Sequence, residues 1–170
     1  RSAAAPTAGL HFTPALFEGL AARGIERTAV TLDVGPGTFK PVTTDDPRDH
    51  DLHAEHVTVP ANAAAAIEAA RAEGRRIVAV GTTVVRTLER AAREGGGSGP
   101  YEGWTKLKIL PGDDFLAVDV LITNFHLPKS TLLMLVAAFA GTEPVLAAYR
   151  EAVRERYRFY SFGDAMLLFP

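Results

Sequence analysis

The chain has 170 residues, of which 47% are hydrophobic and 22% are charged, and its formal net charge at pH 7 is −2. This size and composition predict one globular domain, spanning residues 1–170. The sequence contains no cysteine, which excludes disulfides, thiolate metal sites and a cysteine nucleophile. The acidic balance does not favour nucleic-acid binding, because dedicated RNA-binding domains are usually basic. The longest strongly apolar run, Leu132 to Ala140, is too short to cross a bilayer, so we expect a cytoplasmic protein.

Caps, turns and hydrophobic periodicity divide the first half of the chain into helices and strands. Thr13 and Pro14 are typical of a helix N-cap and first helical position, and Gly24 is typical of a helix end. In chain order, we expect a helix over 15–23, a strand over 27–34, a loop over 41–51, a strand over 53–59, a helix over 63–73 and a buried strand over 77–80.

The second half continues the alternation. We expect a helix over 84–94, a flexible glycine-rich connector over 95–103, strands over 106–110 and 115–122, an apolar central helix over 132–140, an amphipathic helix over 143–155 and a closing strand over 158–161. The connector is not a domain boundary, because strand signals resume directly after it. Strands alternating with helices predict an α/β fold with a mixed, largely parallel sheet and flanking helices.

A polar cluster lies directly before the apolar helix. Asn124, His126 and Lys129 precede Ser130, which can cap the helix, and Pro128 prevents an earlier start. Helix N-termini carry unpaired donors and partial positive charge, so this cluster could hold an anionic or polar ligand. The alternative is a capped core helix with incidental polar residues in the loop.

A second candidate site follows the strand over 77–80. Gly81, Thr82 and Thr83 begin a helix at the carboxyl end of the sheet, where open α/β folds bind ligands. Arg86, one turn into that helix, could pair with a ligand carboxylate. The alternative is that Thr82 only caps the helix and that Arg86 meets an internal acid.

Histidines provide two further candidates. His50, His53 and His56 could bind a metal only if they shared a face, but the expected strand divides them between faces, so we expect no metal. His53 and Glu55 would lie on the same face of that strand and could transfer protons. His11 lies in a turn of small residues before a helix, which suits a close approach of a ligand; a satisfied core histidine is the alternative.

The last candidate surface is basic. Arg150, Arg154, Arg156 and Arg158 alternate with aromatic residues, a pattern that can bind phosphates and stack bases but is also typical of a solvated helix face. Ser161 and Asp164 follow, with a structural or a pocket-lining role left open. A Ser-His-Asp hydrolase is not favoured, because the sequence has no G-x-S-x-G motif.

Four segments of the chain share a resemblance, in order and with sensible spacing. They are AAPTAGLHFT (4–13), VGTTVVRTLE (80–89), ITNFHLPKSTLLMLV (122–136) and YRFYSFGDAM (157–166). Together they resemble the S-adenosylmethionine:tRNA ribosyltransferase-isomerase family of queuosine biosynthesis. The family's chains are about twice as long, so this chain resembles their second half. The family's inserted β-barrel would then lie before Arg1 and be absent from this chain.

The resemblance implies a reaction. The ribosyl part of S-adenosylmethionine is transferred to 7-aminomethyl-7-deazaguanine in tRNA and isomerised, which gives epoxyqueuosine-tRNA and releases adenine and methionine. S-adenosylmethionine is thus the co-substrate, tRNA is the partner, no metal is required, and the intact family is expected to be monomeric. A truncated or non-catalytic paralogue that binds RNA or a nucleoside is the alternative.

The resemblance also implies site residues. His50, His53 and Glu55 fit the family pattern, whereas His56 does not. Proton transfer is assigned to His11, His53, Glu55 and His126, and cofactor binding to Thr82, Thr83, Arg86, Asn124 and Lys129, with acid and base left unassigned. The sequence departs from the family pattern at Asp33, at Pro36 and over 111–114.

Overall fold

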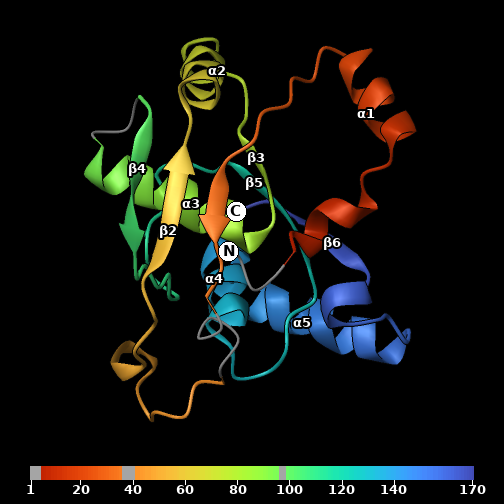
Figure 1. Cartoon of the computed structure of the whole chain (residues 1–170). Helices are drawn as coiled ribbons and strands as arrows, with labels where there is room; N and C mark the ends of the chain where they lie inside the picture. The colour runs from red at the N-terminus through yellow and green to blue at the C-terminus, as the bar shows by residue number, and fades with distance from the viewer. Residues whose placement is uncertain (1–4, 36–40, 96–98) are drawn as a thin grey trace.

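The computed structural model describes residues 5–35, 41–95 and 99–170, apart from the side chain of Phe162. The helices are α1 (Pro14–Ala21), α2 (Ala61–Ala72), α3 (Thr82–Glu94), α4 (Thr131–Ala140) and α5 (Thr142–Arg154), with short 3-10 helices η1 (Thr7–His11), η3 (Pro47–Asp49) and η4 (Tyr160–Phe162). The strands are β1 (Thr31–Asp33), β2 (Glu55–Val59), β3 (Val78–Val80), β4 (Tyr101–Thr105), β5 (Val120–Asn124) and β6 (Ala165–Leu168). Figure 1 shows their arrangement.

The strands form two three-stranded sheets, with the orders β1-β2-β4 and β3-β5-β6. The first sheet is antiparallel throughout. In the second, β3 and β5 are parallel and β6 is antiparallel to β5. The mixed α/β class is therefore confirmed, but the prediction of a largely parallel sheet is wrong for the described strands. The reason is topological: α2 leads from β2 to β3 in the other sheet, and α3 leads back to β4, so neither helix joins parallel neighbours.

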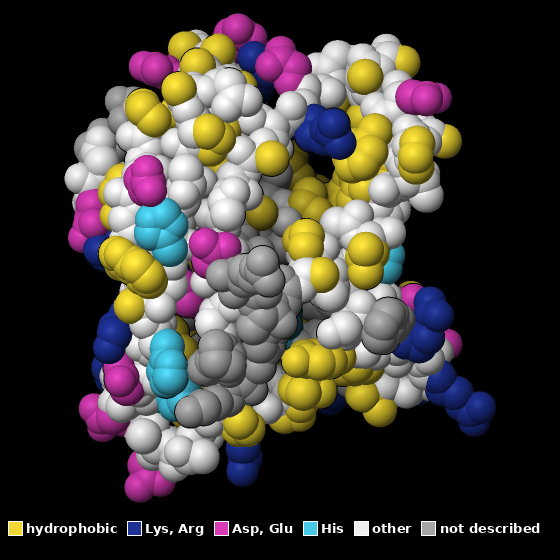
Figure 2. All heavy atoms as spheres, in the orientation of Figure 1, with side chains coloured by type: hydrophobic (Ala, Val, Ile, Leu, Met, Phe, Trp, Pro, Cys, Tyr) yellow, Lys and Arg dark blue, Asp and Glu magenta, His cyan; other side chains and the backbone are white. Residues whose placement is uncertain are grey.

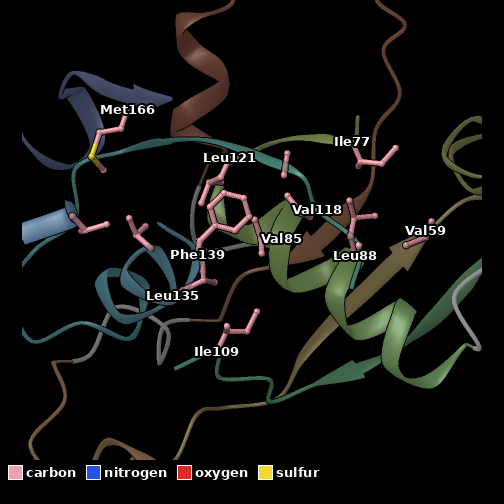
Figure 3. Close-up of a cluster of buried hydrophobic side chains, with 14 of the residues drawn as sticks. Val59, Ile77, Val85, Leu88, Ile109, Val118, Leu121, Leu135, Phe139 and Met166 are labelled. Atoms are coloured by element: carbon pink, nitrogen blue, oxygen red, sulfur yellow. The ribbon is translucent and has the colours of Figure 1, made fainter. Parts of the chain in front are cut away.

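The hydrophobic core lies around α3 and α4 and connects both sheets (Figure 3). Val85 of α3, Leu121 of β5 and Val136 of α4 are fully buried, and Phe139 packs edge-to-face on Phe115 with ring centroids 4.9 Å apart. Each such side chain contributes about 1.5–3 kcal/mol through burial. The expectation that α4 is central is confirmed, because an all-apolar helix is stable only when surrounded.

Helix starts follow the local signals closely. Thr13 caps α1 by accepting from the Leu16 N–H at 3.2 Å, and Ser130 caps α4 by accepting from the Leu133 N–H at 3.2 Å. Each cap stabilises its helix by about 1 kcal/mol.

Several predicted strands are wrong in extent or place. The strand expected over 27–34 is limited to Thr31–Asp33, and the strand expected over 115–122 runs instead over 120–124. Residues 106–110 alternate like a strand but form none. The strand is β4, which begins in the last three residues of the expected connector, because 101–105 pair with β2. Residues 158–161 end in η4, and the closing strand is β6. Pro36 and the connector residues 96–98 lie outside the described residues.

The helix α1 stands apart from the body of the molecule (Figure 1), and none of its residues is buried. Its contacts are local: Phe12 stacks on Phe17 at 5.5 Å between centroids, and the Arg27 guanidinium lies 4.3 Å from the Phe17 ring centre. Figure 2 shows hydrophobic side chains around the hollow between this lobe and the body.

No single helix in the described part of the chain is long and apolar enough to cross a membrane. The consecutive helices α4 and α5 reach that length and composition only as a pair, and they are bent by 116° where they meet.

Candidate functional site

The candidate site lies at the carboxyl ends of the parallel strands β3 and β5. Gly81, directly after β3, donates its N–H to the Ile122 carbonyl of β5 at 2.8 Å, and β5 ends at Asn124. The 3-10 helix η1 contacts both β5 and η4 at this edge. Segments from four distant parts of the sequence therefore meet where parallel strands place ligand sites. They are the same four segments that carry the family resemblance.

Asn124 joins these segments through its side chain, which is only 4% exposed. Its amide nitrogen lies 3.3 Å from the Gly163 carbonyl and 3.4 Å from the Asp164 carbonyl, and its amide oxygen accepts from the Thr7 hydroxyl at 3.3 Å. Carbonyl acceptors on one side and a hydroxyl donor on the other define which amide atom is nitrogen. Asn124 therefore holds the η1 segment against the loop after η4.

Asn124 also orients His11, the exposed last residue of η1. The Asn124 amide nitrogen lies 3.3 Å from His11 Nε2. Because an amide NH₂ only donates, Nε2 accepts this bond, and neutral His11 carries its proton on Nδ1. This arrangement leaves a ring N–H at the margin of the site, in reach of solvent and of a ligand.

A carboxylate lies beside His11. Asp164 accepts from the Arg158 backbone N–H at 2.8 Å and from its guanidinium at 3.2 Å. The backbone hydrogen bond, then the side-chain hydrogen bond, and more weakly the charges of Arg158 and His11, hold the pKa of Asp164 below its usual value. Asp164 is therefore anionic at neutral pH and adds negative charge near the imidazole.

The start of α3 forms the neighbouring wall of the site. Gly81 is its N-cap with φ of 101°, and a Cβ on Gly81 would lie 3.8 Å from the Ala8 side chain and 3.4 Å from the Thr83 hydroxyl. Glycine fits this positive-φ backbone, and the distance to Ala8 shows that η1 packs within van der Waals contact of the helix start. Thr82 is buried and Thr83 half-buried, and both predicted cofactor-binding threonines directly follow Gly81 in the chain.

Arg86 and Glu55 form a buried ion pair between α3 and β2. Arg86 Nη1 lies 2.5 Å from Glu55 Oε2, and the side chains are 3% and 0% exposed. Arg86 Nε donates to the Leu107 carbonyl at 3.1 Å, and Glu55 Oε1 accepts from the Gly35 N–H at 3.0 Å. Arg86 thus meets an internal acid, the alternative that the sequence left open, and its charge is engaged in joining α3 to the first sheet.

His126 is a buried histidine. Its Nε2 lies 3.0 Å from the Thr123 hydroxyl, and its backbone N–H donates to the Tyr149 hydroxyl at 2.7 Å. Burial lowers the pKa of His126 to about 4, so the ring is neutral at pH 7. Burial likewise raises the pKa of Tyr149 to about 12. These properties fit a residue that packs the loop before α4.

The remaining predicted site residues lie on the surface. His53 is exposed because β2 begins only at Glu55, which is buried; the expectation that both share a strand face is wrong. Lys129 is exposed with φ of 55°, and its carbonyl accepts from the Val42 N–H at 2.8 Å.

The three neighbouring histidines have different environments: His50 is buried, His53 exposed and His56 half-buried. Within residues 5–35, 41–95 and 99–170, no group of three or more His, Asp or Glu side chains is placed to hold a metal ion. The absence of a metal requirement stays a prediction.

Thr7 is the site residue that the sequence argument missed, and the role of Asp164 was left open. Thr7 lies in the same motif as His11, four residues earlier, so the motif itself was the available signal. Its hydrogen bond to Asn124 joins residues 117 positions apart, which no local pattern predicts.

Comparison with known proteins identifies the family. The model of a queuosine biosynthesis protein family matches residues 1–168. An S-adenosylmethionine:tRNA ribosyltransferase-isomerase from Anaeromyxobacter sp. (strain Fw109-5) is 66% identical over 98% of this chain and 48% of its own length. The enzyme of the same name from Thermus thermophilus is 62% identical with the same coverage.

A solved structure agrees. The crystal structure of an S-adenosylmethionine tRNA ribosyltransferase from Thermotoga maritima matches with a TM-score of 0.79 and 50% identity, over 94% of this chain and 50% of that one. The chain spans about half the length of the curated relatives it matches. With a family model along nearly all of its length, the chain belongs to the queuosine biosynthesis protein family.

Proposed function

We propose that this chain forms part of an S-adenosylmethionine:tRNA ribosyltransferase-isomerase. The reaction moves the ribosyl group of S-adenosylmethionine to 7-aminomethyl-7-deazaguanine in tRNA, isomerises it, and releases adenine and methionine. The observation that carries the proposal is the meeting of η1, the end of β5 and the loop after η4 around Asn124, with the start of α3 joined to β5 and η1 through Gly81. Since tRNA is the proposed partner, the proposed location is the cytoplasm.

The chemistry needs groups that move protons. The sulfonium of S-adenosylmethionine acidifies the adjacent C5′ protons, so a positioned base can begin the reaction, and adenine needs a proton to depart. His11 is proposed as a proton-transfer group, because it is exposed at the site and oriented by Asn124. In the neutral state its Nδ1–H can donate a hydrogen bond to the substrate, and in the imidazolium state the ring can give a proton to a departing adenine and return to the neutral form. His53 is a second proton-transfer candidate that a loop movement would have to bring closer.

The other groups are proposed to bind and position. Thr82 and Thr83, beside the start of α3, would hydrogen-bond to polar parts of S-adenosylmethionine. Exposed Lys129 would attract its carboxylate or a tRNA phosphate. Glu55, Arg86 and His126 are proposed to act through structure, because all three are buried in contacts of the fold.

The test is the release of adenine from S-adenosylmethionine by the full-length polypeptide, measured with and without tRNA that carries the 7-aminomethyl-7-deazaguanine base. Adenine release that depends on this base, with ribosylated tRNA as the second product, supports the proposal. Binding of tRNA or S-adenosylmethionine without any adenine release supports the non-catalytic alternative.

A further inference from the structure

An open groove of about 670 Å³ lies beside β4, apart from the site around Asn124. Its charged and aromatic lining consists of Arg48, Arg90, Trp104, Lys106, Lys108 and Asp113. We call it the Trp104 groove. In Figure 1, β4 and η1 lie on opposite sides of the molecule. The groove therefore belongs to a different surface from the candidate active site.

Trp104 is the aromatic centre of this groove, and 63% of it is exposed. It lies in β4 opposite His56 of β2, with the two ring centroids 5.3 Å apart and the rings nearly perpendicular. The neighbouring strand positions that face the core hold Val57 and Thr105, so strand alternation directs Trp104 outward. A rigid indole with an open face is a stacking platform for a base.

Cations surround the indole from three elements. Arg48 belongs to η3, Lys106 follows β4, and Arg90 projects from α3. Their carboxylate partners are Asp46 at 3.4 Å, Asp51 at 3.0 Å and Glu94 at 2.6 Å, respectively. The Arg48 and Lys106 pairs are exposed and therefore weak, about 0–1 kcal/mol, so phosphate oxygens can compete for these two cations.

Lys108 builds the floor of the groove. Its ammonium donates to the carbonyls of Pro47 at 3.2 Å and of His50 at 2.6 Å, which fixes η3 against the segment after β4. Arg90 Nε is buried there and has no hydrogen-bond partner among the described residues. The lining itself holds four cations and one carboxylate, although the whole chain has a net charge of −2.

We propose that the Trp104 groove binds a segment of the tRNA substrate, with a base stacked on Trp104 and phosphates held by Arg48 and Lys106. This inference rests on the proposed function and assigns the tRNA contact to a surface. An exposed indole between cations matches the two features of single-stranded RNA, a π-face on each base and one negative charge on each phosphate. An acidic peptide would satisfy the cations but leave the indole face unused.

The chain contains its own control surface. Arg154 ends α5 and Arg156 follows it, in the basic segment whose sequence pattern suits either RNA binding or a solvated helix face. Arg154 pairs with Glu151 and, at 3.2 Å, with Glu155, while Arg158 is engaged by Asp164. Replacing Arg154 and Arg156 removes the same charge as replacing Arg48 and Lys106, so the two double variants form a matched pair.

The experiment measures tRNA affinity of the full-length polypeptide against salt concentration, with circular dichroism confirming folding. Trp104→Ala should weaken binding about tenfold, and Trp104→Phe should restore most of it, because stacking needs an aromatic face. The Arg48→Ala/Lys106→Ala variant should reduce the slope of log affinity against log salt by about 1–2, as expected for two lost phosphate contacts. Arg154→Ala/Arg156→Ala should change neither quantity.

Unchanged tRNA affinity in both groove variants would overturn the inference, as would an effect confined to the α5 variant. A different result would identify an acidic-peptide surface instead. In that case Trp104→Ala keeps its tRNA affinity, and polyglutamate displaces tRNA equally well from this variant and from the unaltered protein. If the unaltered protein neither binds tRNA nor releases adenine, the proposed function fails as well. If it does both while the groove variants bind normally, only the groove assignment fails.

Discussion

At the scale of single residues, environment separates histidines that the sequence treats alike. His11 is exposed and hydrogen-bonded to Asn124, whereas His126 is buried with a pKa lowered to about 4. A proton-transfer group needs access to the substrate and a pKa near the working pH. The geometry therefore favours His11 over His126.

His11→Gln should slow adenine release by about a hundredfold or more, because glutamine can hydrogen-bond to Asn124 but cannot transfer a proton. His53→Gln is the companion variant. Because His53 is exposed, its replacement leaves the fold intact, and the rate of adenine release by this variant reports on chemistry alone. Single-turnover adenine release measures both. Full activity of His11→Gln would remove His11 from the proton-transfer step.

His126 should make stability depend on pH. Its pKa is about 4 in the folded chain against 6.5 in the unfolded chain, so the unfolded state binds more protons between these values. The stabilisation is fully present above pH 6.5 and is lost as pH falls toward 4, by about 3 kcal/mol. Urea unfolding at a series of pH values should show this fall, and His126→Gln should flatten it. An equally steep fall in the variant would assign the dependence to other groups.

At the scale of elements, helix α3 connects the two sheets through charge as well as through the core. Its Arg86 pairs with Glu55 of β2, and its Glu89, which is fully buried, accepts from the backbone N–H groups of Leu116 and Ala117. Buried charges are tolerated only when paired, so these contacts define how α3 sits between its neighbours.

Arg86→Met should destabilise the chain by about 3–5 kcal/mol, because it leaves the Glu55 carboxylate buried without its cation. The double variant Arg86→Met/Glu55→Gln should lose clearly less than the sum of the single losses. Urea unfolding of the unaltered protein, of the single variants Arg86→Met and Glu55→Gln, and of the double variant measures the coupling between the two side chains. Additive losses would mean that the two side chains do not act as a pair.

The junction of β3 and α3 should link backbone geometry to binding. Gly81→Ala forces a side chain into φ of 101° and toward Ala8, whereas Gly74→Ala, at φ of 68°, meets no described atom within 4 Å. Both should lose about 1–2 kcal/mol of stability through strain. Only Gly81→Ala should also weaken S-adenosylmethionine binding, measured by calorimetry, because its backbone strain arises at the start of α3 beside η1, whereas Gly74 lies outside the site. Equal affinity in both variants would separate this junction from the site.

At the scale of the whole molecule, one hydrophobic cluster joins both sheets while α1 has no buried residue. The single cluster favours cooperative unfolding. The unburied α1, with half-buried Phe12 and Phe17 stacked on its side, leaves apolar surface open near η1. Water in an open site weakens the electrostatic contacts on which catalysis depends.

The 170-residue chain should therefore unfold in one transition, yet release adenine far more slowly than a full-length relative. Coincident urea transitions by circular dichroism and tryptophan fluorescence test the first point, and adenine release beside the Thermus thermophilus enzyme tests the second. Turnover at the rate of that enzyme would show that these residues complete the active site by themselves.

The sequence alone determined what depends on neighbouring residues: the caps at Thr13 and Ser130, the apolar helix α4 and the four motifs that identify the family. Caps and periodicity act within a few residues, so a linear sequence displays them. Tertiary structure decided what depends on distant partners: the strand β4, which begins inside the glycine-rich segment, the antiparallel first sheet, and the pairing of Arg86 with Glu55. It also brought His11, Asn124 and Asp164 together while leaving His53 on the surface. These outcomes follow from which strand edges and charges meet in space, and spacing along a chain carries no record of that.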